Sequence, residues 1–173
     1  LMRYVPKVRS LVGSDQIIGL LGQLGLCKPV CMEIPSVRFD VKGEECFLTK
    51  PHQDLRSIRS ARCVTVWLPL TKCDEINGSI AAFSGTHNNG VLPYDMLDGQ
   101  MSVCKKYLNE QRILNVDPGD LVLLNSFCVH ESIRNKSSKI KINLQCFYND
   151  LDALNYNDKL YKLNQIKDYK EIM

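Results

Sequence analysis

The sequence predicts a mostly β domain, an antiparallel β-sandwich or barrel with flanking helices. Two observations support this fold class. The middle of the chain carries several short runs of strand-forming residues separated by turn signals. Helical spacing of apolar residues occurs mainly near the two ends. A length of 173 residues fits one domain, so we take residues 1–173 as a single domain with a β core over about residues 37–148.

Helices are predicted in three places. Ser14 can cap an N-terminal helix over about residues 14–26, in which apolar residues at positions 17, 20, 21 and 24 share one face. A helix is also predicted near residues 100–109. Apolar residues at positions 160, 163 and 166 recur at helical intervals, and they predict a C-terminal helical tail over about residues 157–170.

Five strands are predicted between these helices, from alternation of apolar and polar residues or from runs of β-branched residues. They cover residues 37–41, 62–70, 79–83, 121–124 and 140–148. Asn77-Gly78 is a hairpin signal ahead of the third strand, and Pro118-Gly119-Asp120 is a tight turn ahead of the fourth.

Composition excludes several classes of protein. The net charge is +3, from 22 basic and 19 acidic residues that are evenly scattered, so we expect neither a nucleic-acid nor a membrane-surface partner. No apolar run approaches the roughly 20 residues that span a bilayer. The eight cysteines form no Cys-x-x-Cys pair and several sit in apolar runs, so we expect reduced thiols and a cytoplasmic protein.

Two of the three histidines stand in sequence contexts that suit a metal site. His52 and Asp54 are two residues apart, and residues i and i+2 of an extended segment point to the same side. The alternative for this pair is a polar loop after Pro51. His130 follows an apolar run, where a lone histidine is more often structural. Together the three residues make two histidines and one carboxylate, the ligand type of non-haem Fe(II) oxygenases.

At this point the sequence resembles the phytanoyl-CoA dioxygenase (phytanoyl-CoA hydroxylase) family. The resemblance covers about residues 48–148, and its pieces occur in the order found in that family. They are Lys50–Leu55, Val64–Leu70, Glu75–Ile80, Ser84–His87, Pro118–Val122, and His130–Ser132 followed by Asn135. The resemblance implies a double-stranded β-helix (jelly-roll, cupin-like) barrel, Fe(II), and 2-oxoglutarate as co-substrate.

The family's functional residues fall on six positions of this chain. The resemblance implies that His52, Asp54 and His130 bind iron. It also implies that Ser132 and Trp67 lie at the 2-oxoglutarate pocket. Where the family usually places an arginine for the distal carboxylate of 2-oxoglutarate, this chain has Lys141. Lysine supplies a point charge but not the two-pronged hydrogen bonding of a guanidinium.

Several of these positions have a plainer interpretation. Lys141 shares one strand face with Asn143 and Gln145, and that face either lines a barrel mouth or is simply solvated. Trp67 either contacts the cofactor or packs in the core. His87 resembles a loop histidine outside the ligand set. The arginines at positions 56, 59 and 62 either form a solvated basic edge or face an anionic substrate.

The leading hypothesis is a non-haem Fe(II)- and 2-oxoglutarate-dependent dioxygenase that hydroxylates a small organic substrate and uses O2, with release of succinate and CO2. One alternative is a cupin-type metalloenzyme that does not use 2-oxoglutarate, motivated by Lys141. The other is a non-catalytic binding protein that retains the barrel. Binding of 2-oxoglutarate to the metal-loaded protein discriminates between the first two, and the effect of removing His52 or Asp54 tests the third.

Overall fold

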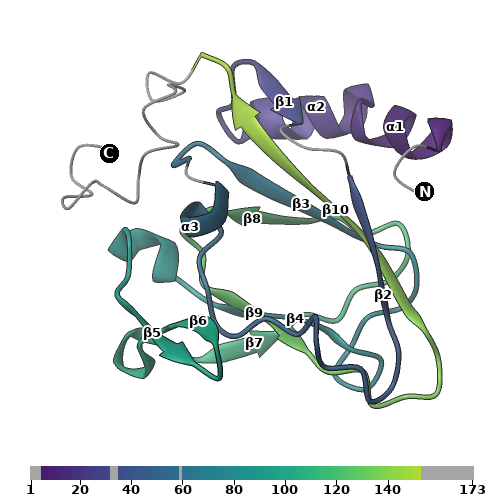
Figure 1. The fold of residues 1–173 in the computed structure, drawn as a ribbon. Helices are drawn as coiled ribbons and strands as arrows, with labels where there is room; N and C mark the ends of the chain where they lie inside the picture. Colours follow the sequence, from purple (N-terminus) through teal and green to yellow (C-terminus); the bar gives the residue numbers. More distant parts are fainter. Residues whose placement is uncertain (1–4, 32–34, 59, 153–173) are drawn as a thin grey trace.

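The computed structural model describes residues 5–31, 35–58 and 60–152, and most of its elements are strands (Figure 1). The helical elements are α1 (Pro6–Val12), α2 (Asp15–Gln23), α3 (Leu55–Ile58) and the 3-10 helices η2 (Thr86–Asn89) and η3 (Lys105–Tyr107). The strands are β1 (Pro29–Cys31), β2 (Ser36–Asp40), β3 (Val64–Pro69), β4 (Ser79–Phe83), β5 (Tyr94–Leu97), β6 (Gln100–Val103), β7 (Gln111–Ile113), β8 (Val122–Asn125), β9 (His130–Ile133) and β10 (Lys141–Asp150).

Two antiparallel sheets face one another (Figure 1). The larger sheet has the order β1-β10-β3-β8, with β2 also paired to β10. The smaller sheet has the order β7-β4-β9, and β5 and β6 form a separate hairpin. This architecture confirms the predicted mostly β fold with flanking helices.

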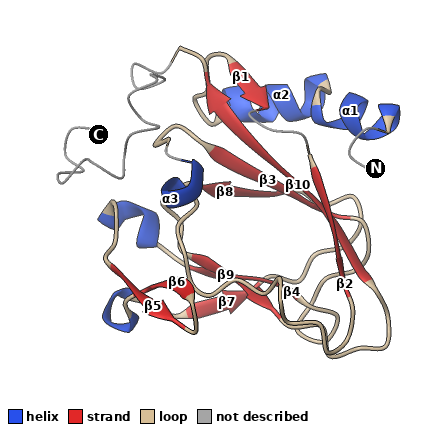
Figure 2. Ribbon diagram, in the orientation of Figure 1, coloured by secondary structure: helices blue, strands red, loops and turns tan. Residues whose placement is uncertain are grey.

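Helices α1 and α2 cover the outer face of the larger sheet (Figure 2). Val66, Leu144 and Tyr148 alternate along β3 and β10, and they pack against Val12 of α1 and Leu21 of α2. Because side chains of a strand alternate between its two faces, the intervening residues of β3 and β10 point the other way, toward the interior between the sheets. That inner face carries the polar residues described below.

The predicted N-terminal helix is confirmed as α2. Its first turn is capped where expected, since the Ser14 Oγ accepts a hydrogen bond from the Ile17 N–H at 3.5 Å. Helix α1 precedes it and was not predicted, although it begins with Pro6, a residue suited to the first turn of a helix. The predicted tail over residues 157–170 lies outside the described residues.

The predicted helix near residues 100–109 is wrong. Strand β6 occupies its first half and pairs with β5, and only the short η3 follows. The two strands are joined by Asp98-Gly99, and both residues have positive φ, at 52° and 77°. This is the Asp-Gly hairpin turn, whose twist matches that of the flanking strands. The turn and the strand pairing thus exclude a helix over the first half of this segment.

Two properties of the whole fold bear on the composition. Within residues 5–31, 35–58 and 60–152, no helix is both long and apolar enough to cross a bilayer. All eight cysteines lie in these ranges as free thiols, and Cys63, Cys73 and Cys146 are buried.

Candidate metal centre

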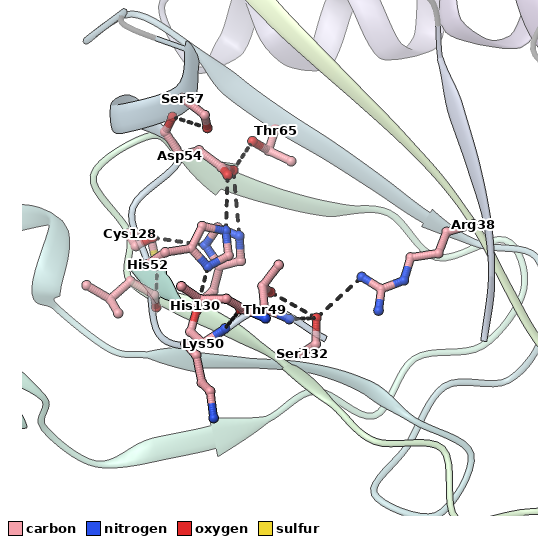
Figure 3. A network of polar contacts seen from close by, with 12 residues as sticks. Arg38, Thr49, Lys50, His52, Asp54, Ser57, Thr65, Cys128, His130 and Ser132 are labelled. Carbon is pink, nitrogen blue, oxygen red and sulfur yellow. Dashed lines mark hydrogen bonds and ion pairs between the residues drawn. The ribbon is translucent and has the colours of Figure 1, made fainter. Parts of the chain in front are cut away.

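His52 and His130 are held side by side by their own backbones. The N–H of His52 donates to the carbonyl of His130 at 2.9 Å, and the N–H of His130 donates back to the carbonyl of His52 at 3.0 Å. The imidazole ring centroids lie 4.4 Å apart with the planes tilted by 50°. This reciprocal pair joins the segment before α3 to the start of β9, so two distant parts of the sequence present adjacent rings (Figure 3).

The segment around Asp54 alternates its side chains as the sequence predicts. Gln53 points away from the rings into a buried site, where its amide nitrogen donates to two backbone carbonyls at 2.8 and 2.7 Å. Asp54 therefore returns to the side of His52. Its Oδ1 lies 3.5 Å from His52 Nε2, and its Oδ2 lies 3.6 Å from His130 Nε2.

The three side chains have the spacing of ligands around one cation. One ligand atom from each of His52, Asp54 and His130 lies within 4.8 Å of the others. Ligand atoms about 2 Å from a shared metal ion stand roughly 3–3.5 Å from one another. The donor set is two imidazoles and one carboxylate, so both its chemistry and its spacing fit a divalent metal such as iron.

Further hydrogen bonds orient each ligand. His52 Nδ1 lies 2.8 Å from the carbonyl of Lys50, and His130 Nδ1 lies 3.1 Å from the carbonyl of Cys128. A carbonyl accepts only from a protonated Nδ1, so these contacts favour the tautomer whose Nε2 lone pair faces Asp54. Thr65 on β3 donates its hydroxyl to Asp54 Oδ2. Figure 3 shows both imidazoles beneath the Asp54 carboxylate.

The electrostatics keep the carboxylate ionised. Burial alone would raise the pKa of Asp54, but the neighbouring imidazoles and the Thr65 hydroxyl outweigh it and hold that pKa below 3.8. Burial lowers the pKa of His130 and favours its neutral form. Burial also acts to lower the pKa of His52, but its contacts with Asp54 raise it overall. The pKa of His52 is thus shifted upward and that of His130 downward, although both rings face the same carboxylate.

A pocket beside the two histidines, here called the inner pocket, contains the three remaining predicted site residues. Trp67, Ser132 and Lys141 all line it. Trp67 also packs in a core cluster with Cys73, which confirms its core-packing interpretation, whereas its contact with a cofactor stays a prediction. The inner pocket holds about 440 Å³ of empty space, including the part open to solvent. Its other lining residues are Arg38, Thr49, His52, Thr65, Ser79, Ile80, Leu124, His130, Glu131, Asn143 and Gln145.

The solvated-face interpretation of Lys141 is wrong. Lys141 is 3% exposed and Asn143 is fully buried, because their face of β10 points between the two sheets. The Lys141 Nζ forms an ion pair with Asp40 Oδ2. Burial lowers the pKa of Lys141 although the contact with Asp40 opposes this.

Sequence reasoning missed Arg38 and Asp40. The register of β2 against β10 places Asp40 opposite Lys141 and Arg38 opposite Asn143, so all four share the inner face. Arg38 Nε lies 2.6 Å from Asp40 Oδ1, and Arg38 Nη1 lies 3.4 Å from the Ser132 hydroxyl. The alternation in residues 37–41 was a usable signal for a shared face, but the sequence does not show which strand lies opposite.

The other singled-out residues lie apart from the three ligands. His87 is exposed in η2. Arg56 donates to the carbonyl of Leu92, and its guanidinium lies 3.9 Å from the ring centroid of Tyr94. Arg62 contacts the carbonyl of Gly25 at 3.4 Å. The arginine at position 59 is outside the described residues.

A second pocket, here called the outer pocket, shares Thr49 and His52 with the inner pocket. It holds about 790 Å³ of empty space, including open solvent. Its lining combines the segment before α3 with the β5–β6 hairpin, and apolar surface predominates. The residues are Thr49, Lys50, His52, Gln53, Arg56, Ser57, Tyr94, Gln100, Met101 and Val103.

Comparisons with known proteins place these features in a family. The family model for phytanoyl-CoA dioxygenase (PhyH) matches residues 8–143. A Caenorhabditis elegans protein named probable phytanoyl-CoA dioxygenase is 28% identical over 116 residues, which cover 61% of this chain and 37% of that protein.

Solved structures share the fold at low sequence identity. EctD from S. alaskensis, solved with 2-oxoglutarate and 5-hydroxyectoine, has a TM-score of 0.69 and 13% identity over 86% of this chain and 54% of its own. The epimerase SnoN, solved with Fe3+, alpha ketoglutarate and nogalamycin RO, has a TM-score of 0.66 and 18% identity over 82% of this chain and 58% of its own. These likenesses confirm the jelly-roll fold. The chain spans about a third of the length of the worm protein and just over half of each solved chain.

Proposed function

The chain belongs to the phytanoyl-CoA dioxygenase family, and from this premise we propose that it is a non-haem Fe(II)- and 2-oxoglutarate-dependent oxygenase that hydroxylates a small organic substrate. The observation that carries the proposal is the cluster of His52, Asp54 and His130 next to a buried cationic pocket. In this proposal the three residues hold Fe(II) and leave positions open for 2-oxoglutarate and O2.

Iron and 2-oxoglutarate, when bound, supply the oxidising chemistry, in which O2 is activated and 2-oxoglutarate is converted to succinate and CO2. The chain contributes geometry. The carbonyls of Lys50 and Cys128 fix the two imidazoles, and the Thr65 hydroxyl fixes the carboxylate. Asp54 and His130 are at most 5% exposed, so these two ligands are shielded from bulk water.

The inner pocket suits the dicarboxylate. Ser132, Lys141 and Trp67 line it within reach of the histidines, and the family resemblance assigns these positions to 2-oxoglutarate. Two cations that line it, Arg38 and Lys141, share the single Asp40 carboxylate, so Asp40 balances only one of their two charges, and the lining carboxylate Glu131 is bonded to Gln111 instead. A distal carboxylate in the inner pocket would neutralise that charge.

The outer pocket is the proposed substrate site. It shares His52 with the inner pocket but is lined by no residue of β10, and its mostly apolar surface suits an organic molecule. Hydroxylation is the finer part of the proposal, because the similar solved structures include an epimerase and a carbocyclase as well as EctD with 5-hydroxyectoine.

A second candidate is a metalloenzyme of the same fold that does not use 2-oxoglutarate. The observation that favours it is the ion pair between Lys141 and Asp40, which engages the residue that replaces the family's arginine. In this case the metal site would load normally, but the inner pocket would not bind a dicarboxylate.

The test is anaerobic reconstitution with Fe(II), followed by titration with 2-oxoglutarate. We expect a visible charge-transfer band to appear on addition of 2-oxoglutarate, and succinate to form once O2 is admitted. Asp54→Ala should abolish both signals, whereas His87→Ala, which removes an exposed histidine outside the cluster, should leave both unchanged. Iron binding without the band would favour the second candidate. Absence of iron binding would reject both candidates.

A further inference from the structure

One carboxylate, that of Asp40, contacts two cations that line the inner pocket. Asp40 Oδ1 receives the Arg38 Nε at 2.6 Å, and Asp40 Oδ2 receives the Lys141 Nζ. Asp40 itself is 4% exposed, so both contacts are largely shielded from water. Glu131, the carboxylate that lines the pocket, is hydrogen-bonded to Gln111 instead. The two cations are therefore only half neutralised by Asp40.

The two cations differ in what they have left to offer a ligand. Lys141 directs its Nζ at Asp40. Arg38 meets Asp40 through Nε alone, and its terminal edge of Nη1 and Nη2 faces the inner pocket. Nη1 makes only a long contact of 3.4 Å with Ser132, and Nη2 is buried with no hydrogen-bond partner among the described residues.

An unpaired buried donor on a guanidinium is costly, so this edge calls for a partner that the described residues do not supply, which a bound anion would provide. Asn143, which lies opposite Arg38 in the β2–β10 register, is also buried with neither side-chain atom hydrogen-bonded among the described residues. Both residues line the inner pocket. The unmet hydrogen-bonding capacity is therefore concentrated at one place, beside Ser132 and on the same side as His130.

We infer that Arg38 on β2, rather than Lys141 on β10, is the residue that binds the distal carboxylate of the 2-oxo acid, with Nη1 and Nη2 as a two-pronged donor. This inference rests on the proposed function. Lys141 acts as a positioning residue: it holds one oxygen of Asp40, while the other oxygen fixes Arg38 Nε and so directs the free edge into the pocket. The guanidinium of the family pattern is thus supplied from the neighbouring strand.

The test compares two variants that each remove one cation bonded to Asp40. The probes are N-oxalylglycine, an unreactive analogue of 2-oxoglutarate with both carboxylates, and oxalate, which lacks the distal one. Each probe is titrated into Mn(II)-loaded protein, and binding is followed by calorimetry and by the fluorescence of Trp67, the single tryptophan of the chain, which lines the inner pocket. Neither readout depends on turnover.

We expect Arg38→Met to weaken N-oxalylglycine binding about 10- to 100-fold, the range for loss of a charge-assisted two-pronged contact. Lys141→Met should weaken it at least several-fold less, and neither variant should change oxalate binding. Arg38→Lys, which keeps the charge but not the two-pronged edge, should still lose most of the affinity for N-oxalylglycine. Arg134→Met removes an arginine paired with Glu45 at 2.7 Å on the surface and is the charge-matched control.

The outcomes separate the inference from the proposal beneath it. If the wild-type protein binds N-oxalylglycine and Lys141→Met loses as much as Arg38→Met or more, the inference is overturned and the proposed function stands. If wild-type protein loads metal but binds N-oxalylglycine no better than oxalate, the proposed use of 2-oxoglutarate fails. Should Arg38→Met not fold, Arg38→Lys decides the question, because wild-type affinity in that variant also overturns the inference.

Discussion

Thr65→Val tests how much the metal centre depends on one hydrogen bond outside the ligand set. Thr65 is 1% exposed on β3, and its hydroxyl donates to Asp54 Oδ2, the oxygen that faces His130. Valine has the same branched shape and favours strands, so the change removes the donor and leaves the packing of β3 in place. The two imidazoles keep their carbonyl partners.

The magnitude follows from the state of the carboxylate. A hydrogen bond to a charged group is worth about 1.5–3 kcal/mol, and partners of metal ligands typically contribute about 10- to 100-fold in metal affinity. Thr65 also helps to lower the pKa of Asp54. We therefore expect Thr65→Val to weaken Mn(II) or Co(II) binding about 10- to 100-fold, and to weaken it further as the pH is lowered, because a proton then competes better for Asp54.

The assay is calorimetric titration of the metal at fixed pH, with the fold checked by circular dichroism. Ser57→Ala is the matched control, since the Ser57 hydroxyl bonds the backbone carbonyl of Asp54 at 3.1 Å and does not contact the carboxylate. Its metal affinity should stay within about twofold of wild type. A folded Thr65→Val protein with wild-type affinity, or an equal loss in Ser57→Ala, would refute the reasoning.

Three further predictions concern stability. Gly78→Ala should lower the free energy of unfolding by roughly 2–4 kcal/mol, because φ is +84° and a Cβ would stand 3.0–3.2 Å from backbone atoms of Ile133, at the end of β9, and of Asn135. Gly85→Ala, with φ +78° and nothing within 4 Å, should lower it by only about 1 kcal/mol, and equal losses would contradict the role of the close approach. Tyr148→Phe should lower the free energy of unfolding by about 1–2 kcal/mol, because the buried Tyr148 hydroxyl donates to the Val12 carbonyl and links α1 to the sheet. An unchanged melting temperature would count against this role of the hydrogen bond. Asp74→Ala should lower the melting temperature at neutral pH, because backbone N–H groups stabilise the Asp74 carboxylate and lower its pKa below 3.8. The stability that the ionised carboxylate contributes is present above that value and is lost as the pH falls through the lowered pKa. The difference in melting temperature from wild type should therefore shrink in acid, and a constant difference would be inconsistent with this role.

Part of this molecule was predictable because its signals are local. The spacing of His52 and Asp54 requires only an extended backbone, and the buried, fully bonded Gln53 shows why that backbone alternates there. The cap at Ser14 also depends on a few neighbouring residues. The Asp98-Gly99 turn was an equally local signal, and it forms a hairpin where a helix was predicted to begin.

The anion-binding side of the site could not be predicted, because it depends on strand register. Arg38 and Asp40 reach Lys141 only through the pairing of β2 with β10. Slipping this pairing by one residue would turn Arg38 and Asp40 outward and bring Val37 and Phe39 toward the inner pocket. Such a slip would leave the buried Lys141 ammonium without its carboxylate, at a cost of several kcal/mol.

The observed register is therefore set from both faces of the same strand pair. On the outer face, Val37 packs against the cluster beneath the helices, while Phe39 at the end of β2 stays half exposed. That apolar contact is small and would hold the register weakly by itself. The ion pair between Asp40 and Lys141 on the inner face adds a strong penalty against the slipped arrangement. The charges that we assign to ligand binding thus also specify the strand alignment that creates the binding pocket.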